Sequence, residues 1–515
     1  MKSTTLIETE ERAAGNFTPT VCYQAMKAHD TRFDGRFFVG VSSTKIYCRP
    51  ICRVKLPLFK NCSFHASAAA AEAQGFRPCL KCRPELAPGF AASEASSTLA
   101  RTAARLIEDA VSGIGAIDAG DDVTAIADRI GVTDRHLRRI FQTEFGVSPV
   151  QYAQTHRLLQ AKRLLTDTVL PVADVAFASG FSSVRRMNTL FAERYGFAPT
   201  RLRKNVVDAN KVGADNAQFF TFNLSYRPPF DWTTLLAFYE KRTIPGVEAV
   251  TDGAYRRIFC FTRASDSKVF TCWLQVKNAA KKNALEVALS PTFAPVISGV
   301  LAHVKRVFDL HADPTQISDT LGKLAKHSRG LRLPGAFDGF ELAVRAVLGQ
   351  QVTVKAARTL TTRFVAEFGE PVQFDIAPPF DDLNFAFPTP VRVATLTQDD
   401  IARLGIVSAR ANAIIAIAQK VVAGELDLSP NAQMETTSSA LQSIKGIGPW
   451  TAGYVAMRAL SWPDAWPPQD VALLNALDLP NTAKGQREAD AIAEKWRPWR
   501  SYAVMHLWES LEKKG

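Results

Sequence analysis

Four cysteines in two close pairs constrain the fold of this chain more than any other feature. The first pair is Cys48 and Cys52, and the second is Cys79 and Cys82. Two short-spaced pairs on separate loops can converge on one tetrahedral zinc ion, because zinc binds four thiolates well. Two interpretations remain open at this point. The site is either a purely structural zinc knuckle or a zinc site in which one thiolate is also a nucleophile.

The length and charge of the chain indicate several domains and a polyanionic partner. At 515 residues the chain is too long for one core, and about 100–200 residues per domain gives three or four domains. The formal net charge is +12, which favours a nucleic acid as partner, although a merely basic protein would have the same balance.

The sequence lacks the signals of secretion and membrane insertion. Met1–Gly15 is polar and has no apolar segment typical of a signal peptide. No run approaches the roughly 18 apolar residues of a membrane span. We therefore expect a cytoplasmic protein with no membrane partner, whose cysteines are metal ligands or free thiols rather than disulfides. Four cysteines without paired spacing are expected to be free thiols: Cys22, Cys62, Cys260 and Cys272.

The pattern of the chain changes several times along its length. A strand-like run at 37–41 and an alanine-rich helix at 67–74 precede an expected linker at 84–98. A helical region then extends to about residue 205, and the polar stretch 208–218 ends it. Alternating aromatic and β-branched runs predict an antiparallel sheet with some helix, and they lie at 219–226, 257–262 and 269–276. From about residue 313 the pattern is helical again.

The first helical region contains a repeat about fifty residues apart. Each copy predicts a helix, a glycine turn and a second helix, capped by Thr133 in one copy and by Ser182 in the other. Tandem helix-turn-helix units with polar second helices are typical of DNA reading in the major groove. The candidate DNA contacts on these second helices are Arg135, Arg138, Arg139, Arg185 and Arg186.

The residues around the cysteines carry a resemblance to a known family. Phe37–Val41, Ile46–Cys52 and Gly75–Pro84 together resemble the zinc domain of the Ada family of adaptive-response proteins, over about residues 17–90. The tandem repeat that follows resembles the AraC-type DNA-binding region. The resemblance implies that Cys48, Cys52, Cys79 and Cys82 bind one zinc ion and that Cys48 accepts a methyl group from a DNA methylphosphotriester.

The chemistry of such a site agrees with the residues around it. Four thiolates on one Zn²⁺ keep a formal charge of about −2, which makes one of them a reactive nucleophile. Basic side chains beside the cysteines can hold the DNA backbone, and those proposed are Arg49, Arg53, Lys55, Arg77, Lys81 and Arg83. Methyl transfer would be stoichiometric and would reduce the repulsion between the site and DNA phosphates. The sequence has no Pro-Cys-His-Arg motif, so a second acceptor for O6-methylguanine is not expected.

A second motif lies near the C-terminus. Leu441–Ala452 reads as a helix, a hairpin with Gly446 and Gly448, and a second helix. Tight glycine geometry exposes backbone N–H groups that can bind a DNA phosphate, and we expect Lys445, Gly446 and Gly448 to contact DNA. Asp470 follows 24 residues after Gly446.

The hairpin, Asp470 and Phe340–Val352 together resemble the AlkA family of 3-methyladenine DNA glycosylases, over about residues 216–515. The resemblance makes Asp470 the catalytic carboxylate and places Trp450, Tyr454 and Trp508 in an aromatic pocket for a flipped base. Trp450 stands where related lyases have a lysine, which implies hydrolysis without strand cleavage. Gln351 matches the residue that wedges into the duplex, and no iron–sulfur cluster is implied.

The sequence thus predicts a mainly α multidomain protein with two α+β parts. The four expected domains are a zinc and methyl-acceptor domain (17–90), an AraC-type tandem helix-turn-helix (97–206), a TBP-like sheet domain (216–310) and a helix-hairpin-helix glycosylase domain (311–515). The expected function is alkylated-DNA repair combined with transcriptional regulation, with promoter and alkylated DNA as partners. RNA polymerase is a further expected partner of a monomeric, nucleoid-associated protein. The alternative is a regulator whose glycosylase-like half only binds damaged DNA.

Overall fold

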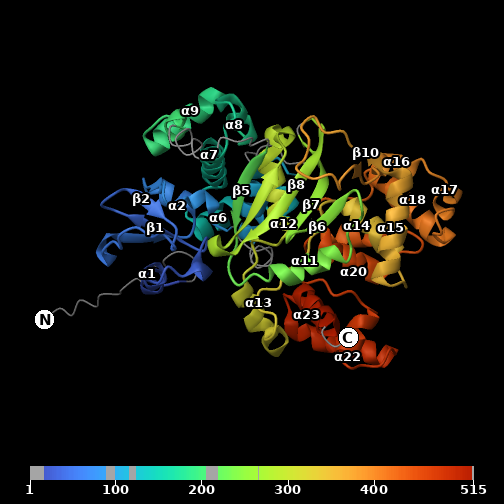
Figure 1. Ribbon diagram of the computed structural model, residues 1–515. Helices are drawn as coiled ribbons and strands as arrows, with labels where there is room; N and C mark the ends of the chain where they lie inside the picture. Colours follow the sequence, from blue (N-terminus) through green and yellow to red (C-terminus); the bar gives the residue numbers. More distant parts are fainter. Residues whose placement is uncertain (1–16, 89–98, 115–122, 204–218, 265, 513–515) are drawn as a thin grey trace.

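The structure is a computed structural model that describes residues 17–88, 99–114, 123–203, 219–264 and 266–512. Four parts follow one another along the chain (Figure 1). We refer to them as the N-terminal region (17–88), the helix-turn-helix region (99–203), the sheet region (219–310) and the C-terminal region (311–512). The expected polar stretch 208–218 lies outside the described residues.

The N-terminal region is a four-stranded sheet with helices. The strand order is β3-β1-β2-β4, and β2 and β4 are parallel. Its elements are α1 (Pro19–Lys27), β1 (Phe38–Val41), β2 (Ile46–Cys48), β3 (Cys62–His65), α2 (Ala68–Ala73) and β4 (Arg77–Pro78). The predicted strand at 37–41 and the predicted helix at 67–74 are confirmed. The expected linker is wrong at its start, because Pro84–Leu86 forms a 3₁₀ helix whose Glu85 pairs with Lys162.

The helix-turn-helix region contains the two predicted repeats. Its helices are α4 (Leu99–Val111), α5 (Val123–Arg129), α6 (Asp134–Phe145), α7 (Pro149–Asp167), α8 (Val172–Ala178) and α9 (Val184–Tyr195). Gly131 and Gly180 adopt φ of +74° and +77° between the paired helices, which only glycine adopts at no steric cost. Thr133 caps α6 as predicted, but α9 is capped by Ser183 instead of Ser182. Ser183 is the residue whose hydroxyl reaches the N–H of Arg186, three positions into the helix.

The sheet region is a five-stranded antiparallel sheet in the order β5-β9-β8-β7-β6. Its strands and helices are β5 (Phe220–Ser225), α11 (Trp232–Glu240), β6 (Glu248–Thr251), β7 (Ala254–Thr262), β8 (Val269–Ala279), β9 (Ala284–Leu289) and α12 (Ile297–Val307). The alternating runs in the sequence predict β5, β7 and β8 well, because each strand buries one face.

The C-terminal region is helical apart from one short two-stranded sheet. Its elements are α13 (Pro314–Leu321), α14 (Gly339–Leu348), α15 (Val354–Phe368), β10 (Glu370–Pro371), β11 (Phe385–Ala386), α16 (Pro390–Ala394), α17 (Gln398–Ala402), α18 (Ser408–Val422), α19 (Met434–Gln442), α20 (Pro449–Arg458), α21 (Val471–Ala476), α22 (Ala483–Ala493) and α23 (Arg500–Glu512). The hairpin between α19 and α20 is the predicted helix-hairpin-helix. The predicted class, mainly α with two α+β parts, is confirmed.

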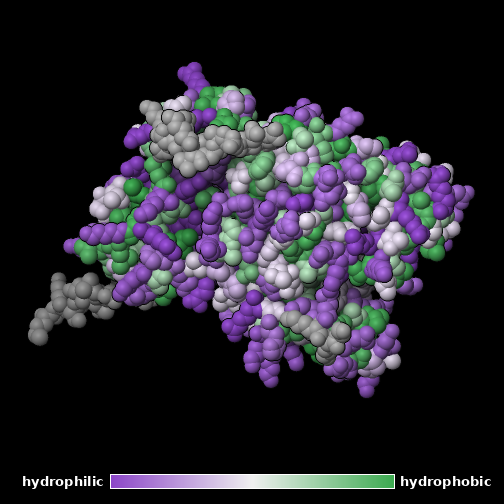
Figure 2. All heavy atoms as spheres, in the orientation of Figure 1, coloured by the Kyte–Doolittle hydropathy of each residue, from purple (hydrophilic) through white to green (hydrophobic). Residues whose placement is uncertain are grey.

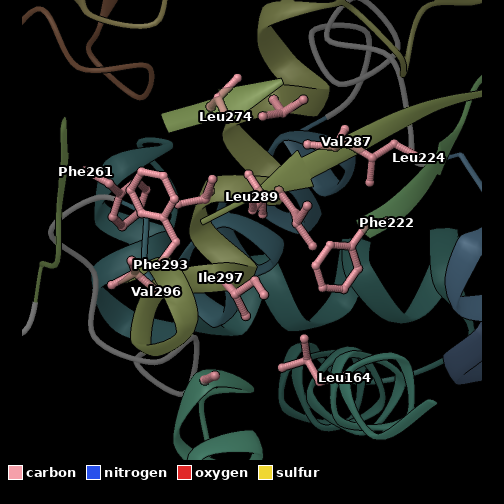
Figure 3. Packing of buried hydrophobic residues seen from close by; sticks show 14 of the residues in the cluster. Leu164, Phe222, Leu224, Phe261, Leu274, Val287, Leu289, Phe293, Val296 and Ile297 are labelled. Carbon is pink, nitrogen blue, oxygen red and sulfur yellow. The ribbon is translucent and has the colours of Figure 1, made fainter. Parts of the chain in front are cut away.

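The largest hydrophobic core joins two of the regions. Buried residues of α7, α8 and α9 belong to the same cluster as those of the five-stranded sheet and α12. Leu164 of α7, for example, lies beside Phe222 of β5 and Ile297 of α12 (Figure 3). The second helix-turn-helix unit therefore packs against the sheet region instead of standing apart from it.

The surface is polar where Figure 2 displays it. Hydrophilic side chains cover most of this face, and apolar groups are scattered among them. Among the described residues, no helix combines the length and the hydropathy that a membrane crossing requires.

Glu72 connects the N-terminal region to the helix-turn-helix region. Its buried carboxylate accepts hydrogen bonds from Tyr47 in β2 (3.1 Å), Thr155 in α7 (3.0 Å) and Tyr195 in α9 (3.2 Å). Burial is the main influence, and it raises the pKa of Glu72 from 4.5 to about 7 despite these bonds.

This pKa shift predicts a pH-dependent stability. Between about pH 4.5 and 7 the folded chain keeps a proton on Glu72 that the unfolded chain has lost. The free energy of unfolding therefore falls as the pH rises through this window, by ~3 kcal/mol in total, and the loss is complete above it. Glu72→Gln preserves an acceptor for both tyrosines and should remove this part of the pH dependence. Unfolding midpoints measured from pH 4.5 to 8 test it. Glu425→Gln, at an exposed glutamate, should keep the wild-type slope, and an unchanged slope in Glu72→Gln would refute the assignment.

Candidate functional site

The four paired cysteines come together in one cluster. The sulfur atoms of Cys48, Cys52, Cys79 and Cys82 all lie within 4.8 Å of one another. Four thiolates around one zinc ion, each about 2.3 Å from the metal, require sulfur atoms roughly 3.8 Å apart. The donor set and its spacing therefore fit a zinc ion. Three of the cysteines are buried and Cys82 is half-buried.

Strand pairing explains why cysteines more than thirty residues apart meet. Cys48 is the last residue of β2, and Cys79 directly follows β4. The two strands are parallel, and Cys79 donates its backbone N–H to the carbonyl of Tyr47 (3.0 Å). Both cysteines therefore leave the sheet at the same edge, and a short turn then returns each chain to the second cysteine of its pair.

Arg49 stabilises the cluster from inside. Its backbone N–H donates to Sγ of Cys82 (3.3 Å), and its guanidinium donates to the carboxylate of Asp34 and to the carbonyl of Cys82 (3.2 Å). The side chain is 5% exposed. The expectation that Arg49 contacts DNA is therefore wrong, because its charge is already paired inside the protein.

The other basic residues near the cluster differ in their exposure and in their ion pairs. Arg83 is half-buried and pairs with Glu85 and Asp167 at 2.9 and 2.6 Å, so its charge is already balanced within the protein. The remaining candidates are exposed, and they are Arg53, Lys55, Arg77 and Lys81.

The candidate DNA-reading arginines lie on the second helix of each repeat. All five are exposed: Arg135, Arg138 and Arg139 on α6, and Arg185 and Arg186 on α9. Arg138 pairs with Asp134 one turn earlier, at 2.9 Å. Such an exposed pair contributes little stability, so it leaves Arg138 able to turn to a phosphate.

A second candidate site is a cavity of about 440 Å³ in the C-terminal half. Its lining includes the predicted aromatic residues Trp450, Tyr454 and Trp508 and the carboxylate of Asp470. Trp450 and Tyr454 are stacked, with ring centroids 5.4 Å apart and an angle of 7° between the ring planes. The ring centroid of Trp508 lies 6.3 Å from that of Tyr454. The cavity has the volume and the aromatic lining of a pocket for a planar ring.

Asp470 lies directly before α21 and is held from two sides. Its Oδ1 accepts the backbone N–H of Leu473 (3.0 Å), which caps the helix, and its Oδ2 accepts the indole N–H of Trp450 (2.8 Å). The residue is 8% exposed. A cap alone would need only one of the two oxygen atoms. The second oxygen faces the aromatic residue that lines the cavity.

Arg458 was missed from the sequence, although it stands one helical turn after Tyr454. It donates to the hydroxyl of Tyr454 (2.6 Å) and to the carbonyls of Pro334 and Gly335 (2.8 and 3.2 Å). Burial alone would raise the pKa of Tyr454, but the positive charges of Arg458 and Arg242 outweigh it and hold the pKa below the ordinary value. The spacing of four residues on α20 was the available signal.

The hairpin before α20 has the geometry of an anion site. Gly446 adopts φ of +94°, and Gly448 begins α20 without a side-chain cap, so the first N–H groups of the helix remain available. Gln350 braces the turn by donating to the carbonyl of Gly446 and to the hydroxyl of Thr451, both at 3.0 Å. Lys445 is exposed beside it.

Two further residues, the predicted Gln351 and the unpredicted Glu509, lie near the hairpin and in the pocket lining respectively. Gln351 is exposed and adopts φ of +54°, a conformation that is unusual for glutamine and is often found at functional sites. Glu509 lines the cavity, and its carboxylate accepts a hydrogen bond from Ser328 (2.5 Å).

Four family models match the chain in the order of these regions. They are the metal binding domain of Ada (21–85), a helix-turn-helix domain (126–205), the AlkA N-terminal domain (221–338) and the HhH-GPD superfamily of base excision DNA repair proteins (344–501). A "probable bifunctional transcriptional activator/DNA repair enzyme AlkA" of Mycobacterium tuberculosis is 34% identical over 497 residues, which cover 95% of this chain and 96% of the relative.

The chain belongs to this family of bifunctional AlkA proteins.

Two shorter relatives each match a part of this chain. DNA-3-methyladenine glycosylase 2 of Escherichia coli is 34% identical over 56% of this chain and 96% of its own length. The bifunctional transcriptional activator/DNA repair enzyme Ada of E. coli is 35% identical over 28% of this chain and 36% of its own length. Both expected resemblances, to the Ada family and to the AlkA family, are confirmed.

Proposed function

We propose that this protein repairs alkylated DNA by two separate reactions and regulates transcription through one of them. The C-terminal half hydrolyses the N-glycosidic bond of alkylated purines such as 3-methyladenine, and Cys48 accepts methyl groups from DNA methylphosphotriesters. The observation that carries the proposal is the buried carboxylate of Asp470 between Trp450 and the start of α21, in a cavity that accommodates a base.

Asp470 acts on the sugar. When the bond between C1′ and the base breaks, its electron pair leaves with the base, and positive charge develops on the sugar ring. The carboxylate of Asp470 stabilises that charge, and a water molecule then forms the new bond to C1′ and releases a proton. Two fixed N–H donors keep the carboxylate in place through the reaction.

The aromatic lining supports selection of a cationic base. Purines alkylated on ring nitrogen carry a positive charge, which is attracted to the faces of electron-rich rings. The candidate rings are those of Trp450, Tyr454 and Trp508. The carboxylate of Glu509 in the same lining adds negative charge.

The hairpin before α20 would bind the DNA backbone. Lys445 and the N–H groups at Gly446 and Gly448 would hold a backbone phosphate, and Gln351 would occupy the gap that the flipped nucleotide leaves. Trp450 stands where a lyase would need a lysine, so we infer hydrolysis without strand cleavage.

Cys48 is our candidate methyl acceptor among the four cysteines. Bound zinc would keep all four sulfurs as thiolates at neutral pH. Cys82 already accepts the N–H of Arg49, and such a bond reduces the electron density available for attack. Attack by Cys48 forms a sulfur–carbon bond and breaks the carbon–oxygen bond of the phosphotriester, whose electron pair remains on the phosphate oxygen. We infer one zinc ion, held by all four cysteines.

Methylation would change the affinity of the N-terminal half for DNA. The transfer removes one negative charge from the cluster, so repulsion of DNA phosphates decreases. The exposed arginines of α6 and α9 would then read promoter sequence, with RNA polymerase as a further partner. We infer a monomer in the cytoplasm, associated with nucleoid DNA. We assign the four domains to 17–90, 97–206, 216–310 and 311–515.

The glycosylase proposal predicts a loss of base release in one variant. Asp470→Asn keeps a side chain that can cap α21 but removes the negative charge, and it should slow release of 3-methyladenine from methylated DNA at least ~100-fold. Single-turnover assays measure this. Asp490→Asn is a matched control, because Asp490 also accepts a tryptophan N–H, from Trp466 (3.0 Å), but does not line the cavity. Equal rates for Asp470→Asn and wild type would favour the alternative, a regulator that only binds damaged DNA.

Another prediction concerns methyl transfer. After incubation with duplex DNA that carries a methylphosphotriester, peptide mass spectrometry should find one methyl group per chain, on Cys48. The same preparation should contain one zinc ion per chain by metal analysis. Unmodified duplex is the control. A methyl group on Cys82, or on no cysteine of the cluster, would rule out the assignment of Cys48.

A further inference from the structure

A second cavity, of about 190 Å³, lies where all four regions of the chain meet. Each region contributes to its lining, for example Ser67 from the N-terminal region, Arg105 from α4, Lys305 from α12 and Tyr502 from α23. Neither reaction site contains these residues. All the lining residues are buried or half-buried, so the cavity admits a small molecule but no DNA duplex.

Each carboxylate of this cavity has at least one partner, although Oδ2 of Asp109 is buried without one. Glu85 pairs with Lys162 (2.5 Å) and Asp109 pairs with Arg306 (2.9 Å). Glu108 accepts the hydroxyl of Tyr152 (2.6 Å), and Asp309 accepts that of Tyr502 (2.8 Å).

The cations in the lining have fewer partners than the carboxylates. Among the described residues, Arg105 and Lys305 form no ion pair or side-chain hydrogen bond, although the carboxylates of Glu108 and Asp109 act on the charge of Arg105 and that of Glu108 acts on Lys305. Four nitrogen atoms in the lining are buried without a hydrogen-bond partner among the described residues: Nε of Arg105, Nε of Arg163, Nη1 of Arg306 and Nε2 of His311. Burial lowers the pKa of Lys305 to about 8, and the nearby charge of Arg163 adds to this effect. Unpaired buried charges and donors cost several kcal/mol of stability unless something compensates them.

We propose that this junction cavity binds a small multivalent oxyanion of the phosphate class, with Arg105 and Lys305 as its main ligands. Arginine and lysine are the side chains that hold phosphate oxygens most effectively, and converging N–H groups with no acceptor are what such an anion would satisfy. A cavity of this volume has room for several water molecules, and hence for inorganic phosphate or pyrophosphate.

The location gives the anion a structural consequence. An occupant would contact groups from α4 and α12, and these helices belong to the regulatory half and the repair half respectively. Anything that binds only the docked arrangement stabilises it by mass action. The anion therefore strengthens the packing of the two halves against each other.

Thermal unfolding of the full chain tests the proposal. Inorganic pyrophosphate at about a hundred times its dissociation constant should raise the midpoint by several degrees relative to chloride of equal ionic strength. Lys305→Met should lose this increase, and without anion its midpoint should be at or above that of wild type, because an unpaired buried charge is gone. Arg105→Gln should behave in the same way, and it provides the test if Lys305→Met does not fold. Lys420→Met and Arg403→Gln, at paired surface residues, should keep the wild-type response.

Three results would overturn the proposal. The first is a wild-type midpoint that does not depend on pyrophosphate. The second is an equal increase in Lys305→Met, Arg105→Gln and wild type. The third is a loss of affinity for a short unmodified duplex in Lys305→Met, which would assign this lysine to the DNA backbone instead of a small phosphate.

Discussion

The hydrogen bond from Trp450 to Asp470 fixes the arrangement on which the repair half depends. Trp450 lies in the first turn of α20, directly after the hairpin that we propose binds a DNA phosphate, and Asp470 caps α21. The bond therefore sets the distance between the hairpin, our proposed contact to the DNA backbone, and the carboxylate of Asp470, our proposed catalytic group. A nearly buried carboxylate requires such donors, so the same contact satisfies the fold and prepares the site.

In the N-terminal half, strand pairing instead of a side-chain hydrogen bond positions the residues of the candidate site. Parallel pairing of β2 with β4 brings Cys48 and Cys79 to one edge of a sheet, and buried Arg49 ties the cluster to Asp34. Asp34 also connects this region to the rest of the chain, because its carbonyl accepts a hydrogen bond from the fully buried Arg227. The two candidate sites thus share no residue, and the junction cavity lies where all four regions of the chain meet.

Local patterns in the sequence were sufficient to predict several of these structural features. The cysteine pairs, the repeated helix-glycine-helix units and the glycine hairpin each depend on residues that are close in sequence, so their geometry could be predicted. Contacts between residues far apart in sequence could not be predicted. Arg49 and Arg83 were expected at a DNA surface, but Asp34 and Asp167 neutralise them inside the protein. The choice of Ser183 over Ser182 as helix cap depends on where the first turn of α9 begins, which composition does not specify. Packing between regions, including the Glu72 contact, has no local signal at all.

The most direct test of this account is single-turnover base release by Trp450→Phe. This substitution keeps an aromatic ring in the pocket and leaves the cap of α21 intact, but removes the N–H that holds Asp470. Loss of a hydrogen bond to a charged group predicts release that is about 10- to 100-fold slower than in wild type. Trp466→Phe removes the equivalent bond to Asp490 outside the cavity and should release the base at the wild-type rate. If Trp450→Phe released the base as fast as Trp466→Phe, the bond from Trp450 would not position Asp470 for the reaction, and this account of the repair half would be wrong.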